Sequence, residues 1–106
     1  MNEIKWSKTE KVVARRAFDT AYQRECEALA RKLKEMIATV REPADIWRIH
    51  DSMTEQRKGI DEKYDYRYSA LVFVFARLLK EGWLKETDLE GLREDKVEKI
   101  KYLANR

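Results

Sequence analysis

The residues best suited to chemistry lie between Asp45 and Arg67, in DIWRIHDSMTEQRKGIDEKYDYR, which contains the chain's only histidine. His50 stands next to Asp51, and a histidine beside a carboxylate could act as a general base. Neighbouring residues of a helix point about 100° apart, so we expect that Asp51 does not orient the imidazole of His50. This segment therefore does not predict a catalytic base.

The sequence also lacks the other groups that an active site would need. Cys26 is the only cysteine and falls in an apolar stripe, where a thiol is typically buried and unreactive. One histidine and one cysteine on different segments do not form a metal-binding motif, and there is no glycine-rich phosphate loop. We expect no catalytic residue, no metal and no cofactor, and therefore a protein that is not an enzyme.

Length and composition favour a single helical domain. The chain has 106 residues, of which 41% are charged, with only one proline and three glycines. The 23 Lys and Arg and 20 Asp and Glu are mixed along the chain and give a net charge of +3. A mixed pattern is typical of a solvated helical surface, although a weak nucleic-acid binder stays open as an alternative. The lone cysteine, the lack of a long apolar run and the polar N-terminus predict a cytoplasmic protein without a membrane insertion.

A long helix is predicted from about Lys8 to about Val40. Ser7 followed by Glu10 forms a capping box at its start, and Pro43 ends it. Its apolar residues recur every three or four positions: Phe18, Tyr22, Cys26, Leu29, Leu33, Met36 and Val40. At 1.5 Å per residue this helix is about 50 Å long, whereas a compact chain of this size is about 34 Å across. We therefore expect a second copy of the chain to cover the overhang.

Three further helices follow, one long and two shorter. The second begins near Pro43, and its stripe consists of Ile46, Ile49, His50, Met53, Arg57, Ile60 and Tyr64. The third is YSALVFVFARLLKEG, which ends at Gly82. The fourth is predicted to open at Thr87 with a capping box to Glu90, and to bury Leu89, Leu92, Val97, Ile100 and Leu103.

Polar residues on the second helix predict an interface. His50 and Arg57 are seven residues apart and share the apolar stripe, where an unpaired charge would be costly. Asp51 and Arg57 are six apart, so they cannot pair within one helix, but they could pair across an antiparallel two-fold contact. Trp47 and Met53 belong to residue types that are enriched at interfaces. The alternative is a surface helix with a local Arg57–Asp61 pair.

Five motifs together resemble the cyanobacterial fluorescence recovery protein family. They are AYQREC, DIWRIHD, KGIDEKYDYR, VFVFARLLKEG and DKVEKIKYLA, and the resemblance runs from about Trp6 to the end of the chain. The sequence departs from the family pattern at Tyr66, where a second acidic residue would be expected. The resemblance implies an all-α, elongated helical homodimer with a small helical head.

The resemblance also implies a function. Members of the family bind the photoactivated orange carotenoid protein, mainly through its C-terminal domain, and speed its return from the red to the orange form. Fluorescence quenching of the phycobilisome then ends, which places the protein with phycobilisomes at the thylakoid surface. The alternative is a related helical adaptor with another protein partner, in a bacterium that lacks phycobilisomes.

Matching positions carry the family's contact residues onto this sequence. Trp47, His50, Asp51 and Arg57 fall in the family's signature patch, and Ile46 falls at the dimer contact. With Ile49 and Met53 they make up the dimer interface that we expect on the second helix. Phe73 and Lys99 are expected to bind the partner from the helical head.

Overall fold

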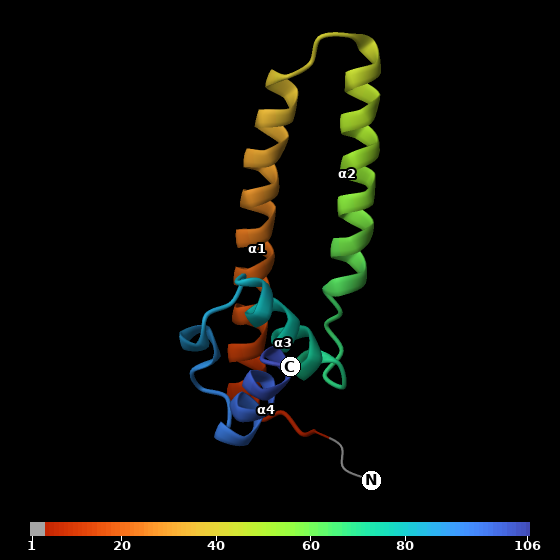
Figure 1. Ribbon diagram of the computed structural model, residues 1–106. Helices are drawn as coiled ribbons and strands as arrows, with labels where there is room; N and C mark the ends of the chain where they lie inside the picture. The colour runs from red at the N-terminus through yellow and green to blue at the C-terminus, as the bar shows by residue number, and fades with distance from the viewer. Residues whose placement is uncertain (1–3) are drawn as a thin grey trace.

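The computed structural model describes residues 4–106, which form four α-helices and one short 3-10 helix (Figure 1). Two long helices, α1 (Lys8–Ala38) and α2 (Pro43–Lys63), come first. They are followed by α3 (Leu71–Glu81), the 3-10 helix η1 (Glu86–Leu89) and α4 (Glu94–Ala104). The predicted all-helical fold with two long and two shorter helices is confirmed.

The N-terminal cap of α1 is the capping box predicted from the sequence. The Ser7 hydroxyl accepts a hydrogen bond from the Glu10 N–H at 3.1 Å, and the Ser7 N–H donates to Glu10 Oε1 at 3.1 Å. Both bonds satisfy backbone groups that the first turn of a helix leaves free. The helix ends at Ala38, two residues before the predicted end, because a turn at 39–42 leads into Pro43.

The upper parts of α1 and α2 lie side by side and antiparallel, and form a stalk that rises from the rest of the molecule (Figure 1). The molecule measures 56 × 27 × 27 Å, with a radius of gyration of 16.9 Å. A compact chain of this length would have a radius of gyration of about 13 Å. The expectation that α1 extends beyond a globular core is therefore confirmed.

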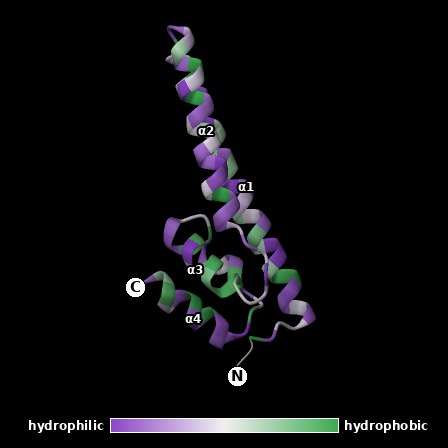
Figure 2. Ribbon diagram, turned by 90° about the vertical axis from the view of Figure 1, so that its right-hand side faces the viewer, coloured by the Kyte–Doolittle hydropathy of each residue, from purple (hydrophilic) through white to green (hydrophobic). Residues whose placement is uncertain are grey.

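The hydrophobic core lies in the head, where the first half of α1 packs with α3 and α4. Three alanines of α1 contribute to it together with Val13 and Phe18, and α3 supplies mostly larger apolar residues. Its fully buried members include Ala14, Ala21, Leu71, Phe75, Leu78, Leu89 and Ile100. Figure 2 shows the contrast between α3, which is largely hydrophobic, and the mixed stalk.

The start predicted for the fourth helix is wrong. Residues 86–89 form η1, and α4 begins only at Glu94. Gly91 has a φ of 103°, a left-handed conformation that interrupts a right-handed helix. A Cβ built at this glycine would lie 2.7 Å from Val13 Cγ2, so the chain passes closely over α1. The inward positions of Leu89, Leu92 and Ile100 are nevertheless confirmed, because each is buried.

An extended segment connects α2 to the head through alternating tyrosines. Tyr64 and Tyr66 both meet Phe18 edge-to-face, with ring centroids 5.4 and 4.8 Å away. The guanidinium of Arg15 lies 3.8 Å from the Tyr66 ring centroid. Tyr66 therefore has a packing role against α1.

A buried charge cluster joins α1 to α4. Lys96 Nζ lies 3.0 Å from both carboxylate oxygens of Glu10, and the Arg93 N–H donates to Glu10 Oε2 at 2.9 Å. Burial acts to raise the pKa of Glu10, but hydrogen bonds from the Arg93 and Ser7 N–H groups and the Lys96 ammonium outweigh it and lower the pKa to about 2. One carboxylate thus caps α1 and fixes the start of α4.

A second charge cluster lies where the stalk meets the head. Lys63 Nζ, whose side chain is 6% exposed, is 2.7 Å from carboxylate oxygens of Glu25 and Glu81. Tyr64 donates its hydroxyl hydrogen to Glu25 at 2.8 Å. Burial acts to raise the pKa of Glu81, but hydrogen bonds from Lys63 and Arg77 lower it overall. These contacts join α1, α2 and α3 at the base of the stalk.

Candidate functional site: two exposed contact surfaces

The predicted interface residues form an exposed surface on α2, which we call the stalk patch. Its members are Ile46, Trp47, Ile49, His50, Asp51, Met53 and Arg57. Trp47 is 64% exposed and Ile46 is 52% exposed, whereas Ile49 and Met53 are half-buried. Exposed side chains of this size are costly in water unless another surface covers them.

Few residues of the stalk are buried within the single chain. Beyond Ala21, α1 contributes no buried residue, and in α2 only Ile60 and Lys63 are buried. The apolar residues predicted for the upper α1 stripe, such as Leu29 and Leu33, are only half-buried. A two-helix hairpin thus leaves much of its apolar surface accessible.

Three members of the stalk patch contact one another. The rings of Trp47 and His50 meet edge-to-face with centroids 6.2 Å apart. His50 Nδ1 lies 3.3 Å from Asp51 Oδ1, closer than the 100° separation of helical neighbours led us to expect. The two side chains bend toward each other over the helix surface, where they are 67% and 82% exposed. Cys26, the chain's only cysteine, lies on α1 and not on the helix that carries this pair.

Arg57 lies further along α2 and contacts a different carboxylate. Its Nε is 3.6 Å from Asp61 Oδ2, as in the local pair that the sequence allowed as an alternative. The two side chains are 85% and 68% exposed, and an exposed pair of this kind contributes little to stability. Within the single chain, Arg57 is therefore available to an incoming carboxylate, and a pairing with Asp51 of a second copy stays a prediction.

The second surface, the head patch, consists of Phe73 on α3 and Lys99 on α4. Phe73 is 56% exposed although its neighbours in LVFVF are buried. Lys99 Nζ lies 5.8 Å from the centroid of the Phe73 ring, a cation–π arrangement. The fold thus brings together two residues that are far apart in the sequence, and gives the head an apolar contact point flanked by positive charge.

Tyr102, which the sequence analysis did not single out, is also exposed on α4. It is 69% exposed and lies three residues after Lys99, on the same side of the helix. The helical period could have indicated that Tyr102 is exposed. Ile100 and Leu103 were assigned to the inner face of the helix, and the positions between them turn away from that face. It enlarges the apolar surface next to the head patch.

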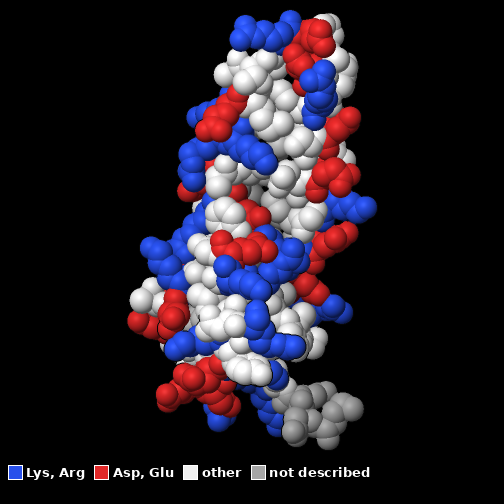
Figure 3. Space-filling view, in the orientation of Figure 1, with Lys and Arg blue, Asp and Glu red and all other residues white. Residues whose placement is uncertain are grey.

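The described part of the chain carries exposed large apolar residues on both surfaces, the stalk patch and the head patch. Within residues 4–106, no three His, Cys, Asp or Glu side chains are grouped to hold a metal ion. Among those residues, too, no helix is long and apolar enough to cross a membrane. Positive and negative side chains are interspersed over the face seen in Figure 3. The fold and its two patches define an all-helical protein with two exposed surfaces that carry large apolar side chains.

Comparisons with known proteins identify its family. The family described as photoprotection regulator fluorescence recovery protein matches residues 6–104. The fluorescence recovery protein of Synechocystis sp. is 41% identical over 102 residues, which cover 96% of this chain and 94% of that protein. The chain belongs to the fluorescence recovery protein family, as the resemblance predicted.

Solved structures agree with this assignment. The fluorescence recovery protein of Fremyella diplosiphon is 46% identical to this chain and superposes with a TM-score of 0.89, over 96% of this chain and 100% of that chain. The Synechocystis protein is 40% identical in its solved structure, with the same TM-score and the same coverage. This chain is therefore an all-α photoprotection regulator of cyanobacterial type.

Proposed function

We propose that this protein binds the photoactivated, red form of an orange carotenoid protein and accelerates its return to the orange form. Membership of the fluorescence recovery protein family over nearly the whole chain is the observation that carries this proposal. The two exposed patches support it, because they offer binding surfaces without a catalytic group. The expected result in the cell is the end of fluorescence quenching at the phycobilisome, in the cytoplasm next to the thylakoid.

The acceleration is an effect of differential binding. A protein without a reactive group can speed a conformational return only if it binds the transition state, or an intermediate on the way back, more tightly than the red form. It must also prefer the red form, or a state that follows it, over the orange form. A rigid head and stalk suit this role, because a surface that does not deform can favour one arrangement of the partner's two domains.

In this proposal each patch binds a different partner. The stalk patch joins two copies in an antiparallel homodimer, since Ile46 and Trp47 need a cover that their own chain does not supply. The head patch binds the C-terminal domain of the carotenoid protein through Phe73 and Lys99. The stalk would then hold the two heads apart, at a spacing set by the 56 Å length of the molecule.

The test is the dark relaxation of the carotenoid protein after blue light, followed by its absorbance. We expect the rate to rise with the concentration of this protein and then to saturate. Phe73→Asp should lower the rate at subsaturating concentration, because a carboxylate is poorly solvated in an apolar contact. Val12→Asp is the matched control, since Val12 is 65% exposed on α1 and lies outside both patches.

Equal relaxation rates with and without the wild-type protein, using the carotenoid protein of the same organism, would contradict the proposed function. The all-helical family fold would stand, and a helical adaptor with another partner would become the better interpretation. A rate that falls equally for Phe73→Asp and Val12→Asp would remove the head patch from the contact.

A further inference from the structure

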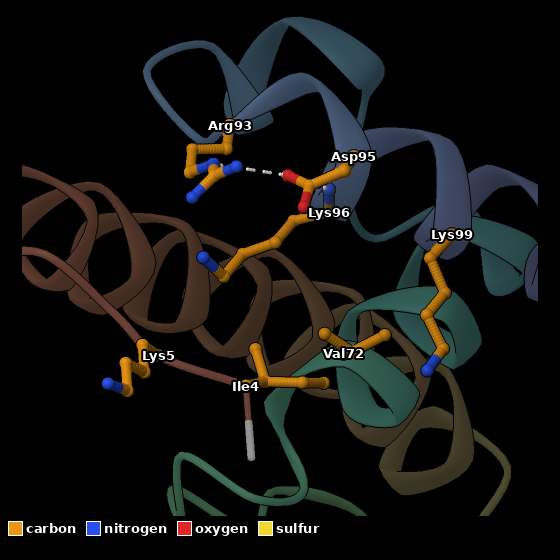
Figure 4. A pocket seen from close by; sticks show the side chains of 7 residues that line it. All are labelled: Ile4, Lys5, Val72, Arg93, Asp95, Lys96 and Lys99. Carbon is orange, nitrogen blue, oxygen red and sulfur yellow. Dashed lines mark hydrogen bonds and ion pairs between the residues drawn. The ribbon is translucent and has the colours of Figure 1, made fainter. Parts of the chain in front are cut away.

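A cavity of about 500 Å³ lies beside the head patch, between the N-terminal segment and the first turns of α4. This volume is within the range of about 300–1,000 Å³ that is usual for ligand pockets. Ile4 and Val72 form its apolar floor, and Figure 4 shows them between Lys5 on one side and Lys99 on the other. The cavity therefore continues the head patch through Lys99, which belongs to both.

The walls of the cavity carry more positive than negative charge. Lys5, Arg93, Lys96 and Lys99 line it, and among the described residues Asp95 is the only acidic one in the lining. Two of these cations already have partners: Lys96 Nζ lies 3.0 Å from Glu10, and Arg93 Nε lies 3.4 Å from Asp95. The remaining two, Lys5 and Lys99, are exposed and make no ion pair within residues 4–106.

The charges and the apolar floor of the cavity favour a ligand that carries both an anionic and an apolar group. Lys5 and Lys99 attract an anion from opposite sides, and the Arg93 guanidinium can turn from its exposed pair with Asp95 toward a second carboxylate. The apolar floor and the neighbouring Phe73 favour an aliphatic or aromatic group next to that anion. A nucleic acid fits less well, because its binding sites require a continuous basic surface, whereas positive and negative side chains are interspersed over the face seen in Figure 3.

We propose that this cavity receives an acidic segment of the protein partner, with a Glu or Asp side chain between Lys5 and Lys99 and an apolar neighbour on Ile4 and Val72. The inference rests on the proposed function in one respect, that the segment belongs to the partner that meets the head patch. It adds Lys5 and Arg93 to the contact and extends the head patch from an apolar point to an acid-binding groove.

The first experiment does not need the carotenoid protein. A short capped peptide of Glu and Leu is titrated into the ¹⁵N-labelled protein, alongside the same peptide with Gln in place of Glu. We expect amide shifts at Lys5, Val72 and Lys96 with the acidic peptide only, weakening as salt is added. The double variant Lys5→Gln/Arg93→Gln should bind about fivefold more weakly, because two rim charges are lost.

A matched control removes the same charge elsewhere. Arg31→Gln/Lys34→Gln changes two exposed residues of the stalk and should leave peptide binding unchanged. Shifts outside the cavity, no binding at millimolar peptide, or an equal loss in the control would overturn the proposal. Tighter binding of a single-stranded oligonucleotide at the same amides would overturn it too, because the groove would then recognise phosphate.

The second experiment separates this inference from the proposed function. The affinity of the red carotenoid protein is compared for the wild type and Lys5→Gln/Arg93→Gln, and we expect it to fall about fivefold or more in the variant. An unchanged affinity overturns the assignment of the groove to this partner, even if the wild type accelerates relaxation. If the carotenoid protein does not bind the wild type at all, the proposed function fails, and the peptide titration alone decides whether the groove binds acidic segments.

Discussion

Removing the carboxylate of Glu10 should destabilise the head more than removing the charge of an exposed side chain would. The side chain is 4% exposed and accepts hydrogen bonds from the Ser7 and Arg93 N–H groups as well as from Lys96. Its pKa falls from the ordinary 4.5 to about 2, which corresponds to about 3 kcal/mol of stability at neutral pH. Glu10→Gln also leaves the Lys96 ammonium buried without a counter-ion, and breaking a buried pair costs about 3–5 kcal/mol.

The pH dependence of stability follows from the direction of this shift. Because the folded pKa lies below the unfolded pKa, the contribution is fully present above pH 4.5 and is lost as the pH falls toward 2. About 2 kcal/mol of it should be gone at pH 3. The free energy of unfolding of the wild type should therefore decrease by about 2 kcal/mol more between pH 7 and pH 3 than that of Glu10→Gln.

Urea unfolding followed by far-ultraviolet circular dichroism measures both quantities, at one protein concentration because a dimer unfolds in a concentration-dependent way. Glu98→Gln is the matched control, since Glu98 lies exposed on α4 and its loss should cost less than about 0.5 kcal/mol. The double variant Glu10→Gln/Lys96→Met should be more stable than the sum of the single variants indicates. A loss below about 1 kcal/mol in Glu10→Gln, or an acid dependence equal to that of the wild type, would refute this account of the cluster.

The remaining predictions concern the dimer and the turn before α4. Light scattering should give about twice the chain mass of 12.7 kDa. Ile46→Glu should shift the measured mass toward that of the monomer, because a buried carboxylate without a partner costs several kcal/mol. A monomeric wild type at high concentration would contradict the predicted dimer. If Asp51 pairs with Arg57 of the second copy, a double-mutant cycle on dimer affinity should show coupling, and swapping the two charges should restore part of the loss; zero coupling would assign both residues to solvent or the partner. Gly91→Ala should lower the free energy of unfolding in urea by about 1–3 kcal/mol, since φ is 103° and the added carbon would lie 2.7 Å from a side-chain carbon. The control Gly59→Ala adds a carbon in open space within α2 and should be neutral or stabilising. Equal effects of the two changes would show that neither strain nor contact matters at Gly91.

The local signals of the sequence were sufficient for most helix boundaries. The capping box of Ser7 and Glu10, the proline at 43 and Gly82 each act within a few residues of the chain, so their effect can be predicted without knowledge of the rest of the fold. The same logic failed at Thr87 and Glu90. That motif resembles a capping box, but the chain there adopts the left-handed turn at Gly91 because α1 lies directly beneath it.

Contacts between distant parts of the chain could not be predicted from spacing. Glu10 was recognised as a capping residue, but its second role as the counter-ion of Lys96 depends on how α4 returns to the start of α1. Lys63 was not recognised at all, because a lysine at the end of a helix is ordinarily solvated, and only the packing of α1 and α3 around it makes it buried and paired.

Of the two contact surfaces, one could be predicted from the sequence and the other depends on tertiary packing. The sequence by itself was enough to predict the stalk patch, because all its residues lie on one helix, where the helical period and the family resemblance both indicate them. Only the tertiary structure decided that Phe73 would meet Lys99 and that Lys5 would face Lys99 across a cavity. The physical reason is that helical period acts over a few residues, whereas the packing of α3 against α4 depends on the buried side chains of the whole head.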